Sequence, residues 1–292
     1  MRISVSTSRA LPLFLLFFAT AYGQQSDFHQ QVITLYDFRP HELGRQQQQE
    51  KSNKLDTFWK MVESDKSKYL PLLTAELNDT NNPSFFFYDG SKLLLSLSQD
   101  THDKMTALNA ISRSDPRDLQ LDDYLFTVHS LAVEGLDTSE AAFHILGYPK
   151  FHVIIPQHAL TLGQDYSLIC MVLPTKESFY LEKAIQRLKT EADATSQKSL
   201  LLLLWYSVTK EGDTAIKDFI HASNGAATAK AYASELLERN KNLKPSLLSF
   251  LKTRNIPDLK EQRKRAMARI SDESLSELDS ITTDIRAAYA KE

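Results

Sequence analysis

The chain has 292 residues, of which 42% are hydrophobic and 24% are charged, proportions typical of a folded protein rather than a disordered segment. Only 8 glycines occur, and this scarcity argues against Gly-rich phosphate loops and against folds dominated by β-strands. The formal net charge is −3, so the chain is a poor general binder of nucleic acid, and we expect no nucleic-acid partner.

Residues 1–23 have the pattern of a secretory signal peptide. Arg2 and Arg9 give a positive start, Leu11–Ala21 is an apolar core, and Ala21-Tyr22-Gly23 has the small-x-small form that precedes cleavage. The core is too short to cross about 30 Å of hydrocarbon as a helix. We therefore expect cleavage near Gly23, a secreted or periplasmic protein, and no transmembrane segment after cleavage.

Residues 24–53 form a polar, Gln-rich N-terminal segment that includes four consecutive glutamines at 46–49. A helical body is expected from Lys54, because Leu55, Phe58, Trp59 and Val62 share one helical face. Asn78-Asp79-Thr80 is an N-glycosylation triplet, and the sequence leaves open whether Asn78 is modified.

The segment Phe85–Ser98 is compatible with two structures. Its aromatic start, Phe85–Tyr88, has the composition of a strand, whereas the leucines at 93–95 and 97 extend the apolar character as in a helix. No partner strand is evident nearby, so we expect a helix.

The most informative stretch is Thr195–Ser223, which predicts two helices joined by a turn. Leu200–Tyr206 is apolar throughout, so the first helix should be buried on several sides. Thr195 or Ser196 is the expected N-cap, and Gly212 is the expected residue past the helix end. A second helix should then begin at Asp213-Thr214.

The same pattern occurs earlier, at Tyr124–Leu146. Aligning Glu134-Gly135 with Glu211-Gly212 places the two segments 77 residues apart, or two units of about 38 residues, close to the periods of helical repeats. Between them, Gln157–Leu173 and Lys176–Thr190 are expected to form a third helix pair.

This pattern resembles HEAT-like α-helical repeats, most clearly in the segment EGDTAIKDFI at 211–220. The resemblance implies an all-α fold of α-α hairpins stacked as an α-solenoid, over a repeat domain at residues 54–240. An irregular helical bundle is the alternative. Residues 241–292, which include a strongly basic stretch at 260–269, are expected to form a C-terminal helical cap or extension.

Few residues point to chemistry. The common zinc, Cys-pair, nucleophile-elbow and phosphate-loop motifs are missing from the sequence. Four histidines, His129, His144, His152 and His158, lie within 30 residues and are weak candidates for metal binding, because imidazole is a good zinc or copper ligand. The one cysteine, Cys170, lies in an apolar run and is expected to be buried.

We therefore expect a secreted or periplasmic scaffold that binds a protein or peptide, with no catalytic residues and no cofactor. We expect a scaffold because helical solenoids offer long binding surfaces. The alternative is a helical envelope enzyme or a metal-binding protein that uses the four histidines. The sequence does not identify the ligand or the oligomeric state.

Overall fold

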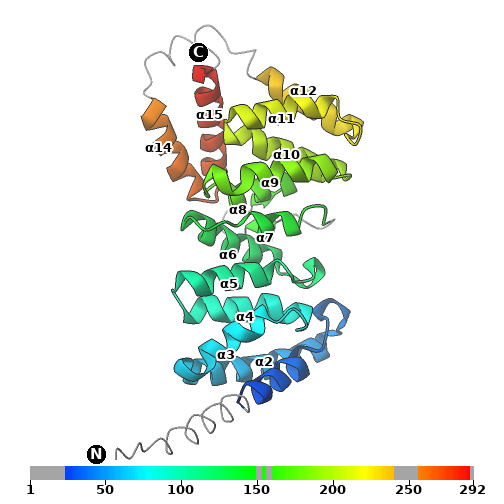
Figure 1. The fold of residues 1–292 in the computed structure, drawn as a ribbon, viewed down its shortest axis with the longest axis vertical. Coiled ribbons are helices and arrows are strands. Elements are labelled where there is room, and N and C mark those ends of the chain that lie inside the picture. The colour runs from blue at the N-terminus through cyan, green and yellow to red at the C-terminus, as the bar shows by residue number, and fades with distance from the viewer. Residues whose placement is uncertain (1–23, 149–152, 156–159, 240–255, 290–292) are drawn as a thin grey trace, which may run out of the picture. The chain divides into compact units, whose positions relative to one another are not determined.

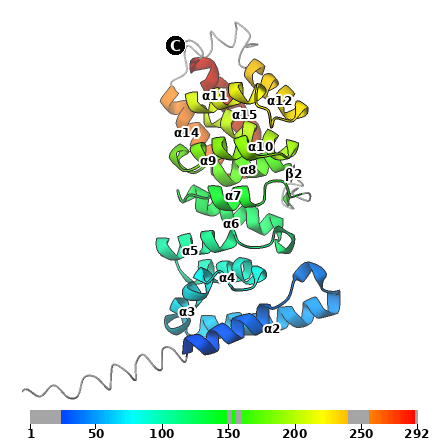
Figure 2. The ribbon, with the colours of Figure 1, turned by 45° about the vertical axis from the view of Figure 1, so that its right-hand side comes forward.

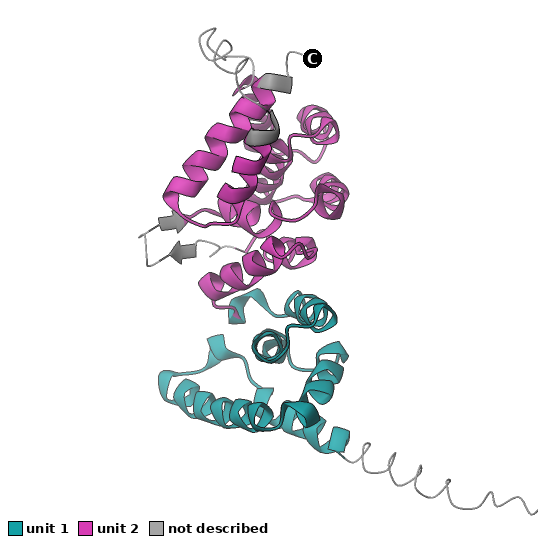
Figure 3. Cartoon of the chain, turned by 90° about the vertical axis from the view of Figure 1, so that its left-hand side faces the viewer, with its two compact units in different colours: residues 1–118 teal, residues 119–292 magenta. Residues whose placement is uncertain are grey.

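The computed structural model describes residues 24–148, 153–155, 160–239 and 256–289. The expected signal peptide lies outside these residues. The fold is all-α, as predicted, apart from one hairpin of two three-residue strands among the described residues. The chain divides into two compact units, Met1–Asp118 and Leu119–Glu292 (Figure 3).

The described part of unit 1 begins with a helix at residues 24–36, which is followed by the elements labelled in Figure 1. These are the short 3-10 helix η1 (Pro40–Glu42), α2 (Arg45–Ser64), α3 (Lys66–Asn78), α4 (Ser84–Leu97), α5 (Thr101–Ile111) and the 3-10 helix η2 (Pro116–Asp118). Helix α3 packs against α2, α4 and α5, so it lies at the centre of this unit.

The helix at residues 24–36 belongs to the core of unit 1 despite its polar composition. Phe28, Val32 and Tyr36 recur every four residues and are almost completely buried. The Phe28 ring packs on Phe58 of α2, with 5.5 Å between ring centroids. Helix α2 runs through residues 53 and 54 without a break, although the sequence predicts a domain boundary there.

The segment at 85–98 is a helix, as predicted, because α4 extends over Ser84–Leu97. Its aromatic start is core rather than surface, since Phe86 and Phe87 are buried. Asp89, on the same helix, accepts hydrogen bonds from the Tyr36 hydroxyl at 2.5 Å and from Trp59 Nε1 at 2.9 Å. Burial raises the pKa of the Asp89 carboxyl, and these two donors oppose that shift.

The described residues of unit 2 contain the remaining elements. They are α6 (Leu121–Val133), α7 (Ser139–His144), β1 (Val153–Ile155), β2 (Leu160–Leu162), α8 (Gln164–Val172), α9 (Glu177–Thr190), α10 (Ala194–Ser207), α11 (Lys210–Ile220), α12 (Ala227–Arg239), α14 (Ile256–Met267) and α15 (Asp272–Tyr289). The two strands are antiparallel, with Val153 opposite Leu162.

The helices of unit 2 pack in an alternating pattern. Helix α8 contacts both α6 and α10, and α10 contacts α12, while α9 contacts both α7 and α11 (Figures 1 and 2). Each helix from α6 to α10 therefore packs on the second helix after it. This arrangement places α6, α8, α10 and α12 in one layer and α7, α9 and α11 in another.

For the third helix pair, the prediction of the second helix is confirmed, but the predicted start of the first helix is wrong. Helix α9 extends over Glu177–Thr190, close to the predicted 176–190. The helix predicted from Gln157 begins instead at Gln164, because residues 160–162 pair as strand β2. Gly163 separates the strand from the helix and takes the N-cap position. A segment as short as residues 160–162 does not show by its periodicity whether it is a strand or a helix.

Helix α10 is the buried centre of unit 2, as its sequence predicts. Every residue from Ser199 to Ser207 is buried. Its N-cap is Asp193, whose carboxylate accepts from Ser196 N at 2.7 Å, so the predicted cap at Thr195 or Ser196 is wrong. Gln197, also fully buried, uses Nε2 and Oε1 to bind backbone groups of Glu191, Asn224 and Ala226, which ties the flanking loops to α10.

The turn after α10 differs from the expected one. Helix α10 ends at Ser207, and Val208 adopts a left-handed conformation with φ of 56°. The hydroxyl of Thr209 then accepts from Gly212 N at 3.1 Å and caps α11, so Lys210 begins the second helix instead of ending the first. Gly212 therefore lies inside α11, and the prediction that it follows the end of a helix is wrong.

The two aligned glycines have different structural roles. Gly135, with φ of 90°, follows the end of α6, where its N–H binds Ala132 O and the next N–H, of Leu136, binds Leu131 O. This is the hydrogen-bond pattern of a Schellman motif. Gly212 instead allows close packing, because a Cβ there would lie 2.8 Å from Leu204 O. The sequence alignment that led to the repeat prediction therefore pairs two glycines whose structural roles differ.

Helices α14 and α15 pack on one another and on the end of α10. Arg286 of α15 donates through Nε to Trp205 O at 2.7 Å and through Nη1 to Asp213 at 2.7 Å, and Arg263 of α14 donates to Tyr206 O. Both arginines are buried. The last carbonyls of α10 carry partial negative charge, so two guanidinium groups satisfy and stabilise that end.

We predict that Gly212→Ala destabilises unit 2 by about 1–3 kcal/mol, since the new methyl group would overlap backbone and side-chain oxygens. Thermal or denaturant unfolding would measure the change. Lys210→Ala, at an exposed position in the same turn, is the matched control and should change stability by less than about 0.5 kcal/mol. Equal effects of the two substitutions would contradict the close approach of α11 to α10.

Arg286→Met should lower the free energy of unfolding by about 1–3 kcal/mol, because the buried Trp205 carbonyl would lose its charged donor. Arg269→Met is the control, since Arg269 is exposed and its pair with Glu277 lies at the surface. Chemical denaturation of both variants tests the difference. A loss at Arg269 as large as at Arg286 would show that the carbonyl contact is not the cause.

Candidate functional site

An apolar groove lies between α9 and α11 in unit 2. Its floor consists of Leu188 and Phe219, which are buried, with the half-exposed Ile185 and Ala215 beside them. The volume is about 570 Å³, which is within the usual range of binding pockets. The apolar floor can accept a large side chain of a partner.

The rim of this groove carries charges of both signs. Lys189, Lys210, Glu211 and Asp218 line it and are exposed. At one end, Asn224 Nδ2 donates to the carbonyls of Leu188 and Glu191, at 3.1 Å each, which fixes the α11–α12 turn against α9. A partner with an apolar anchor and flanking ionic groups would therefore match the groove.

The four candidate histidines were predicted from the sequence, and two of them, His152 and His158, lie outside the described residues. His129 is on α6, is 8% exposed, and makes a 3.0 Å hydrogen bond between Nε2 and Met267 O. His144 is the half-buried last residue of α7. Neither belongs to the group of neighbouring potential metal ligands within the described part of the chain, so the histidine hypothesis stays a prediction.

His129 has a structural role that the sequence does not reveal. Its contact with Met267 joins α6 to the end of α14, 138 residues later. Burial lowers the pKa of its imidazole, and the bond to Met267 only partly opposes this shift. The folded protein therefore favours the neutral form of His129.

Two other sequence expectations concern single residues. Cys170 is buried in α8, as predicted, and burial raises the pKa of its thiol to about 12. The thiolate that a nucleophile requires is therefore disfavoured. In the basic stretch at 260–269, Arg263 is buried against α10 and pairs with the protein's own backbone, whereas Arg265 and Arg269 are exposed.

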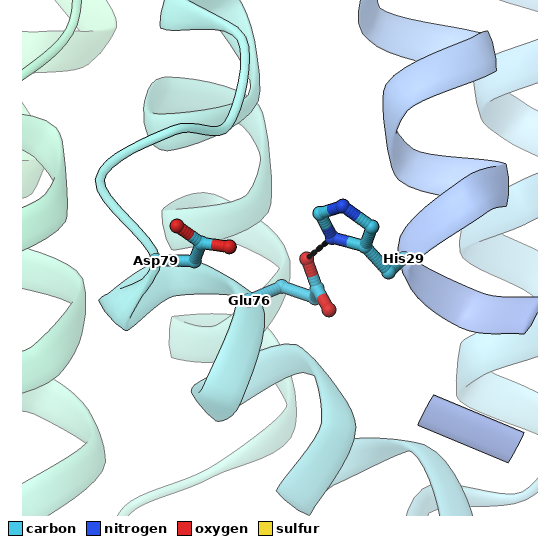
Figure 4. A group of neighbouring side chains, drawn as sticks. All are labelled: His29, Glu76 and Asp79. Carbon is cyan, nitrogen blue, oxygen red and sulfur yellow. Dashed lines mark hydrogen bonds and ion pairs between the residues drawn. The ribbon is translucent and has the colours of Figure 1, made fainter. Parts of the chain in front are cut away.

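A group of possible ligands in unit 1 was missed by sequence reasoning. His29, Glu76 and Asp79 converge at the end of α3, as Figure 4 shows. The signal available in the sequence was the i, i+3 spacing of Glu76 and Asp79, which places them on one helix face. His29 lies 47 residues before Glu76, and only the packing of the helix at residues 24–36 brings it there.

Comparisons with protein families, curated proteins and solved structures returned no match to this chain. Among the described residues, no helix is both long enough and apolar enough to cross a membrane. The function proposed for this chain therefore rests on its own geometry.

We predict that acid weakens unit 2 partly through His129. Because the folded pKa lies below the ordinary value of about 6.5, the unfolded chain binds a proton first, and stability falls as pH drops from that value toward the folded pKa. The slope in this range is at most about 1.4 kcal/mol per pH unit. His129→Gln should reduce it in unfolding measurements between pH 7 and 5, while the exposed control His221→Gln should not. An unchanged slope in His129→Gln would contradict this assignment.

Proposed function

We propose that this chain is a secreted or periplasmic helical-repeat protein that binds a protein or peptide through the groove between α9 and α11. The observation that carries the proposal is the groove itself, which combines an apolar floor at Leu188 and Phe219 with rim charges of both signs. The chemistry fits a peptide segment that inserts one large apolar side chain and carries an acidic and a basic group beside it.

The alternating packing of unit 2 supports the α-solenoid part of this proposal. Helices α6, α8, α10 and α12 contact in series, and α7, α9 and α11 contact in a second series, as in stacked helix pairs. We also propose the HEAT-like repeat. The alignment behind it is weakened because Gly135 follows the end of a helix, whereas Gly212 lies inside one. An irregular bundle remains the alternative architecture.

Secretion is proposed from residues 1–23, whose positive start, apolar core and small-x-small end fit a signal peptide. If the protein is secreted, its partner should be found outside the cytosol. The scaffold proposal includes no catalytic group and no cofactor.

We predict that Ala215→Arg weakens partner binding, since Ala215 is partly exposed in the groove and a guanidinium would occupy the space above Phe219. Arg is a good helix former, so α11 should remain folded. The measurement is cross-linked capture with tagged protein from its native compartment, followed by a titration with the captured partner. We expect one stoichiometric partner and a loss of affinity of at least about tenfold.

Ala231→Arg is the matched control, because Ala231 is exposed on α12 and lies outside the groove. This variant should bind as the unchanged chain does. Partner binding that survives in Ala215→Arg, with circular dichroism unchanged, would show that the groove is not the binding surface.

A further inference from the structure

Unit 1 brings one imidazole and two carboxylates together at the carboxyl end of α3. His29 comes from the helix at residues 24–36, Glu76 is in the last turn of α3, and Asp79 is its C-cap residue. One ligand atom from each lies within 4.8 Å of the others. In Figure 4 the carboxylate of Asp79 and the ring of His29 lie on opposite sides of Glu76.

The Glu76 side chain is only 4% exposed, which is unusual for a carboxylate. Its Oε2 accepts from His29 Nδ1 at 2.8 Å and from Asn82 Nδ2 at 2.9 Å. Asn82 is neutral, and the His29 side chain is 41% exposed. Buried carboxylates are usually paired with a charge or coordinate a metal. The contact with His29 already pairs Glu76, and a cation held here would supply a full positive charge where a neutral imidazole would supply only a hydrogen bond.

Asn82 supplies a second, independent observation. It is 5% exposed, and its Oδ1 has no hydrogen-bond partner within the described part of the chain. Its amide is next to the cluster, since Nδ2 binds both Oε2 and the backbone oxygen of Glu76. A buried acceptor without a donor costs about 1–3 kcal/mol, and a bound ion is one way in which such a group is satisfied.

We propose that His29, Glu76 and Asp79 bind one divalent transition-metal ion of the Zn²⁺ type. Ligand atoms at about 2.0–2.2 Å from a tetrahedral ion are about 3.3–3.6 Å apart. The hydrogen-bonded pair of His29 Nδ1 and Glu76 Oε2, now 2.8 Å apart, would therefore open slightly, and Asp79 would move closer by about 1 Å. The ring nitrogen that binds the ion would lose its proton to solvent, so the bonds to the ion would replace that hydrogen bond. The imidazole favours zinc or a similar metal over Mg²⁺ and Ca²⁺, which prefer oxygen ligands alone. Three protein ligands leave a coordination position for water.

The neighbouring contacts fix the ligands and set limits on affinity. Asp79 Oδ1 accepts from the backbone N of Asn81 at 3.0 Å and from its Nδ2 at 2.9 Å, which orients the carboxylate. Arg113, which donates to Leu77 O, interacts electrostatically with Asp79. Its positive charge opposes a metal ion, so we expect weaker binding than at an all-cysteine structural site.

A bound ion would join the helix at residues 24–36 to α3. The two segments already meet through the core that includes Phe28 and Leu73. A ligand that binds only the folded state stabilises it, so Zn²⁺ should also raise the melting temperature of unit 1.

The test uses the purified full chain and two probes, Zn²⁺ in a calorimetric titration and Co²⁺ by its visible absorption. We expect one ion per chain and a Co²⁺ spectrum of four-coordinate type. His29→Gln and Asp79→Asn should each weaken binding at least tenfold and remove the Zn²⁺-dependent rise in melting temperature. Both positions are partly exposed, so both variants should fold, which circular dichroism would verify.

His102→Gln is the matched control, because His102 is an exposed histidine of unit 1 outside the cluster. Its affinity for Zn²⁺ should be unchanged. Two results would overturn the proposal: the absence of saturable one-to-one binding, or binding that persists in His29→Gln and is lost in His144→Gln. The latter would place the metal at the histidines of unit 2.

Discussion

Two buried arginines at the carboxyl end of α10 are the interaction on which unit 2 most depends. Arg263 and Arg286 come from helices far along the chain, and both donate to the last carbonyls of this helix. Burial lowers the pKa of each guanidinium, yet both remain cations because an arginine pKa is so high. A completely buried helix end has no water to bind its carbonyls, so these donors permit α10 to occupy the centre of the unit.

The two candidate functional regions lie outside this buried centre. The groove is formed where α11 leaves α10 and packs against α9, so the close contact at Gly212 indirectly sets the position of Ala215 and Phe219. The cluster of His29 and Glu76 belongs to unit 1 and depends on a different element, the helix at residues 24–36. Peptide binding and metal binding are therefore independent proposals, and either can fail without the other.

The sequence predicted the features that depend on local patterns and missed those that depend on distant packing. The apolar run at 200–206 was sufficient to predict a buried helix, because no surface helix is apolar on all sides. The prediction for the turn after this helix was wrong. The residue in the left-handed conformation is Val208, at a position where glycine is usual. In the sequence, Arg263 belongs to the strongly basic stretch at 260–269 and His29 to the polar N-terminal segment. Only tertiary contacts give these two side chains buried partners.

Native-state amide hydrogen exchange would test the central role of α10 most directly. If α10 is the centre of unit 2 and its end is closed by the two arginines, the amides of residues 198–207 should exchange only through global unfolding of that unit, with the same dependence on denaturant. Their protection should exceed that of the more exposed α11 and α12. Exchange of these amides at a lower free energy than those of α6 or α12 would contradict the account.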